Sequence, residues 1–251
     1  MSQRTPDLVV EAPSGLGVTA ISRRSAKDSV VDEIRSSIMR GALKAGVRII
    51  EHKLAIDLNV SQTTVREALV DLEHLGFVQR VPPRKTFVTR LTHRDIDEIY
   101  AVRVPLEQVA IDLLAAIPTP DLANAEKASE GMRRAAAAED RIRFESMDLE
   151  FHRALWAATE NRTLAATLEK IVVKLFAFGF VMNQQIHASR SRMEEQAGQH
   201  GRILALIKGH DFQAAKNLMA ASMDKTWLDD IEFAEENTTF DSDERETLSD
   251  S

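Results

Sequence analysis

The sequence predicts a mainly α-helical protein with a small N-terminal domain and a C-terminal all-α six-helix bundle. Apolar residues recur three and four positions apart over most of the 251 residues, as in amphipathic helices. Two β-prone runs, 77–81 and 86–90, lie close together on either side of a turn that contains two prolines. Proline, glycine and asparagine divide the rest of the chain into helical segments.

Three helices and a β-hairpin are expected in the N-terminal domain, residues 20–92. The first helix ends before Gly41, and the second is short, around residues 54–58. Ser61 stands where an N-cap belongs and opens a third helix that ends at Gly76. The hairpin follows directly. This order is that of a winged helix-turn-helix domain.

The C-terminal domain is expected over residues 93–236, without a convincing strand. Breaks at 117–120, at Asn161 and at 209–211 separate its helices. The predicted helical segments are 93–116, 119–138, 140–160, 162–186, 188–208 and 211–236. Residues 1–19 form an arm, and residues 237–251 an acidic tail, that we expect to be disordered.

Composition excludes several classes of protein. There is no cysteine, which excludes a disulfide scaffold, a Cys-based zinc site and thiol chemistry. No apolar run reaches the ~18 residues of a membrane-spanning helix, and no secretory signal is apparent, so we expect a cytoplasmic protein. The net charge is −7, yet residues 20–94 hold 14 Lys and Arg against 8 Asp and Glu. A basic region in an acidic chain indicates a domain that meets a polyanion.

The third predicted helix has the features of a DNA-recognition helix. Val65, Leu69 and Leu72 form its packing face, while its first turn is polar and partly cationic. A helix N-terminus also favours phosphate oxygens. The alternative is that this polar start only caps a surface helix. The expected DNA contacts are Ser61, Gln62, Thr63, Thr64 and Arg66 on this helix, with Arg84 and Lys85 in the hairpin.

Residues 34–89 resemble the DNA-binding domain of the GntR family of bacterial transcriptional regulators. The matching residues are Ile38, Gly41, Leu43-Lys44, Gly46, Glu51, Leu54-Ala55, Leu58, Val60-Ser61, Val65 to Leu69, Leu72, Gly76 to Val78 and Thr86 to Val88. The resemblance implies that the second and third helices form the helix-turn-helix and that the hairpin touches the minor groove. It also implies a homodimer, usually a repressor, on a palindromic double-stranded DNA operator.

The chain departs from the family pattern at several positions. The departures are Ala45 in place of Pro, Asn59 in place of Gly, Gln62 in place of Arg, Thr64 in place of Pro and Lys85 in place of a wing Gly. Glutamine prefers the adenine edge where arginine prefers guanine, so we expect an operator that differs from the usual half-site.

The C-terminal bundle resembles the FCD effector domain of the same family. The resemblance rests on residues 99–107, 144–152, 160–164 and 200–204. Six helices rather than seven suggest the VanR-like subgroup. The resemblance implies a small-molecule effector, commonly a carboxylate.

Asp148 and His152 are four residues apart and therefore share one helical face, from which both can reach a divalent ion. Such a pair is otherwise a salt bridge or a cap. The resemblance implies zinc or nickel held with two further histidines, of which His200 matches the first. Ser222 stands where the second is expected, so a weakened or empty site is the alternative. Glu145, one turn before Asp148, could compensate.

Arg103 matches the family arginine that faces the effector pocket and can fork onto a carboxylate. The alternative is a surface arginine paired with Glu107. We also assign Ser222 to the effector pocket. The aromatic run 174–182 is interpreted as bundle core or dimer contact, or else as an apolar wall of the pocket.

The leading hypothesis is a DNA-binding transcriptional regulator controlled by an effector, and not an enzyme. A metal-dependent hydrolase is the first alternative, although the chain has no His-Glu-x-x-His motif, nucleophile elbow or Gly-rich phosphate loop. An effector-binding module with a degenerate DNA-binding domain is the second, suggested by Gln62 and Lys85.

Overall fold

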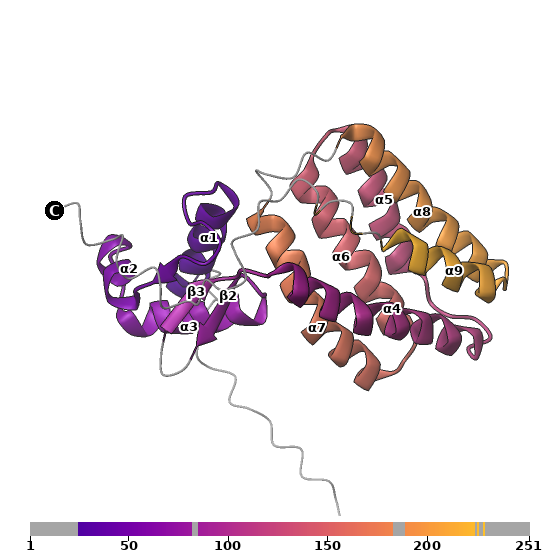
Figure 1. Ribbon diagram of the computed structural model, residues 1–251, viewed down its shortest axis with the longest axis horizontal. Coiled ribbons are helices and arrows are strands. Elements are labelled where there is room, and N and C mark those ends of the chain that lie inside the picture. Colours follow the sequence, from indigo (N-terminus) through magenta and orange to yellow (C-terminus); the bar gives the residue numbers. More distant parts are fainter. Residues whose placement is uncertain (1–24, 82–84, 183–188, 224, 226–227, 229–251) are drawn as a thin grey trace, which may run out of the picture.

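The computed structural model describes residues 25–81, 85–182, 189–223, 225 and 228. Figure 1 shows a small N-terminal part beside a larger helical part. The N-terminal part contains α1 (Ala26–Met39), β1 (Arg48–Ile49), α2 (Glu51–Asp57), α3 (Gln62–His74), β2 (Val78–Val81) and β3 (Lys85–Val88). The arm and the acidic tail expected to be disordered lie outside the described residues.

Local signals in the sequence fix most ends of these elements. Ser25 forms a capping box with Asp28 at the start of α1, and Ser61 accepts a hydrogen bond from Thr64 N at the start of α3. Gly41 follows α1 with φ 74°, a left-handed conformation that glycine adopts without strain. The winged helix-turn-helix pattern is therefore confirmed.

The sheet has one strand more than the sequence predicted. The strand order is β1-β3-β2, and Arg48 and Ile49 of β1 pair antiparallel with Phe87 and Thr86. A strand of two residues is too short to show an alternating pattern, and that is why sequence periodicity missed it.

The described residues of the C-terminal part form a ring of six helices. They are α4 (His93–Ala115), α5 (Ala123–Ala137), α6 (Arg141–Ala158), α7 (Arg162–Val181), α8 (Arg190–Lys208) and α9 (Phe212–Ser222). Each packs on two neighbours, so the order round the ring is α4-α9-α8-α5-α6-α7. Figure 1 shows these helices side by side in the larger part of the molecule. The described residues contain no helix long and apolar enough to cross a membrane.

The last helix is shorter than predicted. The sequence pattern carried it to residue 236, but α9 ends at Ser222, and Met223 leaves the helical region with φ −86° and ψ 51°. Lys225 then forms an ion pair with Asp97 of α4, and its ammonium lies 5.9 Å from the centre of the Tyr100 ring. These contacts direct the chain onto α4 rather than along the axis of α9.

The two parts meet at the end of α3. A Cβ atom on Gly76 would lie 2.8 Å from the carbonyl oxygen of Val173 in α7, closer than real atoms approach. Beside it, the rings of Phe77 and Phe180 stack with 6.0 Å between their centres. Glycine therefore allows the DNA-binding part to pack directly on the α7 backbone.

Candidate functional site

The third helix is built as the sequence predicted. Val65, Ala68, Leu69 and Leu72 are buried, and Gln62, Thr63 and Arg66 are exposed near its N-terminus. Burial of one face holds the helix on the domain, which leaves the polar first turn open to a partner. Two DNA contacts were expected in the hairpin, Arg84 and Lys85. Lys85 is the first residue of β3 and pairs with Val81. Arg84 lies outside the described residues.

Two consecutive residues of α2 contact the exposed side chains of α3. Glu51 accepts hydrogen bonds from Arg66 at 2.9 and 3.2 Å, and His52 Nδ1 lies 2.7 Å from Gln62 Nε2. Sequence reasoning gave no structural role to His52, because a pair ten positions apart follows no helical spacing. Only the packing of α2 on α3 brings them together.

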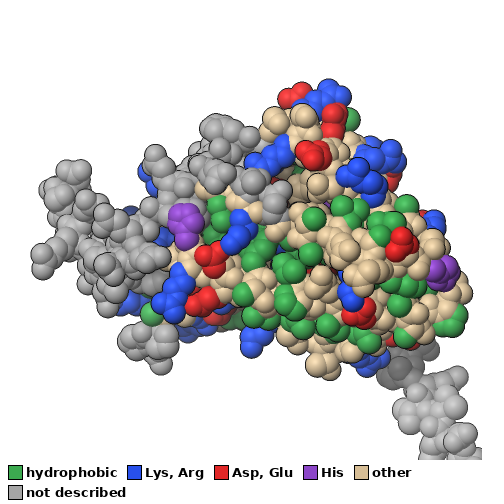
Figure 2. All heavy atoms as spheres, turned by 45° about the vertical axis from the view of Figure 1, so that its right-hand side comes forward, with side chains coloured by type: hydrophobic (Ala, Val, Ile, Leu, Met, Phe, Trp, Pro, Cys, Tyr) green, Lys and Arg blue, Asp and Glu red, His purple; other side chains and the backbone are tan. Residues whose placement is uncertain are grey.

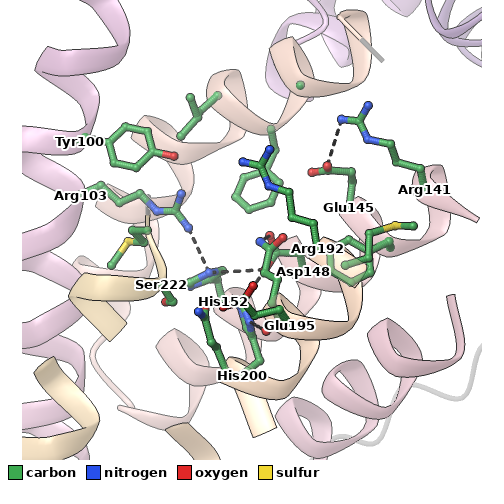
Figure 3. Close-up of a pocket in the computed structure, with 18 residues that line it drawn as sticks. Tyr100, Arg103, Arg141, Glu145, Asp148, His152, Arg192, Glu195, His200 and Ser222 are labelled. Atoms are coloured by element: carbon green, nitrogen blue, oxygen red, sulfur yellow. Dashed lines mark hydrogen bonds and ion pairs between the residues drawn. The ribbon is translucent and has the colours of Figure 1, made fainter. Parts of the chain in front are cut away.

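A cavity of about 380 Å³ lies between the helices of the ring. Figure 3 shows the side chains that line it. Its wall includes side chains from α4, α6, α7, α8 and the end of α9. The lining residues used below are Tyr100, Arg103, Glu145, Asp148, His152, Phe176, Gly179, Arg192, His200 and Ser222. All the effector and metal residues proposed from the sequence therefore face one space.

Asp148, His152 and His200 converge in this cavity. One ligand atom from each lies within 4.8 Å of the others, and all three side chains are buried. His200 Nε2 is 2.9 Å and His152 Nε2 is 3.7 Å from Asp148 Oδ1. The spacing of four on α6 does place Asp148 and His152 on one face, and α8 supplies His200 from across the cavity.

The outer nitrogen of each imidazole faces an oxygen atom. His200 Nδ1 donates to the Gln196 carbonyl at 2.8 Å, and His152 Nδ1 lies 2.9 Å from Glu107 Oε1. Histidines that ligate metals commonly donate the other ring N–H to an oxygen, as His200 does, whereas Nε2 of His152 accepts from Arg103 Nη2 at 3.0 Å. Asp148 Oδ1, His152 Nδ1 and His200 Nε2 are buried without an aligned hydrogen bond. The residues present therefore fit a divalent ion.

The charged forms of Asp148 and His200 stabilise each other. Burial raises the pKa of Asp148, but His200, His152 and Arg103 outweigh burial, so this pKa lies below its usual range. Burial lowers the pKa of His200, but Asp148 outweighs it, so that pKa lies above its usual range. An ionised Asp148 is the form that a metal ion requires.

Arg103 is buried with 4% of its surface exposed and lines the cavity, so the alternative of a surface arginine is wrong. Its Nη2 donates to His152 Nε2 at 3.0 Å, and its Nε lies 3.5 Å from Glu107 Oε1. The pairing with Glu107 is thus present inside the bundle. Glu107 also accepts from Trp156 Nε1 at 2.8 Å and orients both Arg103 and His152, a role that sequence reasoning missed.

Ser222 and Glu145 also line the cavity, and Glu145 is not among the three clustered ligands. Ser222 is the last residue of α9, and its Oγ donates to the Met219 carbonyl at 2.9 Å. Glu145 accepts from Arg141 at 3.2 Å, and burial raises its pKa. Compensation by Glu145 is therefore not what the geometry favours.

The aromatic run has both of the interpreted roles. Leu175 and Phe178 belong to the buried core, and Phe176 and Gly179 face the cavity. The whole run lies on α7. This helix therefore forms an apolar wall of the cavity and also contacts the DNA-binding part through Phe180, whose ring stacks on that of Phe77.

The fold and the two sites define a DNA-binding regulator with a ligand-binding helical domain. The family model "Bacterial regulatory proteins, gntR family" matches residues 26–88, and that of the FCD domain matches residues 98–225. The chain belongs to the GntR family with an FCD domain, as the resemblance implied, and it is a transcriptional regulator.

The similarity to known regulators extends over most of the chain. An uncharacterised HTH-type transcriptional regulator, YdhC of Bacillus subtilis, is 32% identical over 76% of this chain and 84% of its own. The regulator McbR of Escherichia coli is 27% identical over 77% of this chain and 87% of its own. The solved structure of McbR covers 80% of this chain and 94% of its own with a TM-score of 0.62 and 26% identity.

Proposed function

We propose that this regulator is a homodimeric repressor whose binding to a palindromic operator is controlled by a small carboxylate in the helical cavity. The observation that carries this proposal is the convergence of Arg103 with Asp148, His152 and His200 in one cavity. A guanidinium fork binds a carboxylate through two parallel hydrogen bonds. The cavity is of the size that takes a small metabolite.

Within the cavity each group has a distinct task. Asp148, His152 and His200 would hold zinc or nickel, which supplies a positive charge for an anionic effector. Arg103 orients the carboxylate, and Ser222 offers a hydroxyl. Phe176 closes the apolar side, which favours an effector with a carbon skeleton of its own.

The DNA contacts proposed on α3 are Ser61, Gln62, Thr63, Thr64 and Arg66, with Arg84 and Lys85 in the wing. The gntR match over residues 26–88 supports a working DNA-binding domain over a degenerate one, and a regulator over a metal-dependent hydrolase. Such a regulator works where the chromosome is, in the cytoplasm. The six helices α4–α9 of the described residues support the VanR-like subgroup.

Exposed apolar side chains support a dimer through the helical domain. Val102 and Val109 are seven residues apart on α4 and are 47% and 43% exposed. Figure 2 shows hydrophobic side chains distributed over the face of the helical domain that is turned to the viewer. A second copy would remove such surface from water.

Selection of duplexes from a random pool, followed by light scattering of the protein on the selected site, tests this function. We expect an inverted repeat with two chains bound. Selection of no sequence would overturn the operator, and one chain on an asymmetric site would overturn the homodimer.

A further inference from the structure

The side chain of Gln62 is held by α2 at the place where α3 would meet a base. Gln62 is the first residue of α3 and is exposed, and its Nε2 lies 2.7 Å from Nδ1 of His52. His52 is itself exposed on the short helix α2.

The chemistry of this contact fixes the amide. The nitrogen of a glutamine side chain only donates, so His52 Nδ1 must accept and the ring proton must be on Nε2. Gln62 then uses one N–H on His52 and keeps Oε1 and a second N–H for a partner. An adenine edge requires one acceptor for N6–H and one donor for N7.

The opposite orientation presents a different pattern. If the amide turned over, Oε1 would face Nδ1 and both N–H groups would point away, so the outward pattern would consist mainly of donors. That orientation requires a proton on Nδ1, so His52 with its proton on Nε2 disfavours it. A glutamine without His52 rotates between the two orientations. In this tautomer the neighbouring residue on α2 therefore selects the hydrogen-bonding pattern that α3 offers.

We propose that His52 is a specificity-determining positioning residue that holds the Gln62 amide in the orientation that reads adenine. The proposal rests on the proposed role of Gln62 as a base reader. It assigns part of the sequence preference of α3 to a residue of α2 that acts through Gln62.

Two substitutions of His52 test whether its hydrogen-bond acceptor, rather than the bulk of its ring, positions the Gln62 amide. In His52→Asn, Oδ1 stands at the same distance along the side chain as Nδ1 and keeps the acceptor. In His52→Phe, a ring of similar shape has no acceptor. His74→Phe, at the exposed end of α3, is the matched control for a surface histidine.

Gln62→Ala first identifies the operator position whose base preference depends on Gln62. Each variant is then titrated on the four operators that carry A, C, G or T at that position. We expect His52→Phe to reduce the preference for adenine roughly threefold to tenfold, as for one hydrogen bond. His52→Asn and His74→Phe should retain it. In the Gln62→Ala background, His52→Phe should add nothing. Melting curves of all variants check that the domain is folded.

Three outcomes would overturn the proposal in different ways. An unchanged adenine preference in His52→Phe would show that Gln62 needs no orientation. An equal loss of affinity for all four bases would make His52 a direct DNA contact. A Gln62→Ala variant with the parent's preference at every position would remove Gln62 from the base readers, and the proposal with it, while the operator itself would stand.

Discussion

His200 of α8 lies against Asp148 of α6, with 2.9 Å between His200 Nε2 and Asp148 Oδ1, and both side chains are buried. The two helices each pack on α5, so this contact joins them across the cavity rather than along a shared surface. Its charge state therefore affects both the stability of the bundle and the binding of an ion.

The contribution of this pair to the stability of the metal-free protein should depend on pH. Asp148 has a lowered pKa, so its contribution is complete above the ordinary aspartate value and is lost as pH falls through the lowered one. His200 has a raised pKa, so its contribution is complete below the ordinary histidine value and is lost as pH rises through the raised one. Both are present between about pH 4 and 6.5.

Melting curves of chelator-treated protein from pH 4 to 9 test this. The difference in Tm between the parent and Asp148→Asn should be largest inside that window and should shrink at higher pH. Asp112→Asn, which removes an exposed carboxylate paired with Lys216, should give a small difference. A difference for Asp148→Asn that is constant across the range would contradict the assignment of these charges.

Arg66→Ala should weaken operator binding without unfolding the protein. Arg66 is exposed and held by Glu51, so its loss should remove the proposed base or phosphate contact, worth roughly 1–3 kcal/mol, and leave the core intact. Gel-shift titration at constant salt measures the effect. Arg162→Ala removes the same charge at the exposed start of α7 and should leave the affinity unchanged. Equal affinity of parent and Arg66→Ala would mean that α3 is not the reading helix.

Gln62→Arg should move the selected sequence toward guanine at one position of each half-site. Arginine donates two parallel hydrogen bonds to guanine O6 and N7, whereas glutamine pairs with adenine N6 and N7. Selection from a random pool with both proteins compares the two consensus sequences. If they are identical, Gln62 makes no base contact.

The parts that the sequence predicted are those governed by short spacings. Ser61 as an N-cap and Asp148 with His152 on one face need only neighbours within a turn of helix, and the structure has both. The contacts of Glu107 with His152 and of His52 with Gln62 join separate helices. No spacing along the chain encodes them, so they appear only once the helices pack.

The end of α9 is a boundary that short spacings in the sequence predicted wrongly. Apolar residues continue past Ser222, so periodicity extended the helix, but Lys225 is held by Asp97 of α4 and the chain leaves the axis. The helix ends three positions before Lys225, whose ion pair joins the chain to α4. The same turn leaves Ser222 as the last helical residue, at the wall of the cavity.

Ser222→His should strengthen metal binding. Asp148, His152 and His200 offer three ligand atoms, and Ser222 lies on the same cavity wall with a hydroxyl that is a poor ligand for zinc or nickel. An imidazole there adds a fourth strong donor. We expect a sub-stoichiometric ion in the dialysed parent and a fuller complement in the variant. Because an ion that binds only the folded state stabilises it, a tenfold gain in affinity should add about 1.4 kcal/mol at saturation.

Metal analysis after dialysis, with melting curves in added zinc or nickel, decides between two outcomes for this variant. Ser222→Gln controls for side-chain size without an imidazole, and His200→Ala in the Ser222→His background should return the ion content to that of a three-ligand site or below. Added zinc should raise the Tm of Ser222→His more than that of the parent, and leave Ser222→Gln close to the parent. If neither the parent nor Ser222→His binds an ion, Asp148 and His152 are a helix-face pair, and recognition of the effector falls to Arg103 and the hydrogen-bonding groups around it.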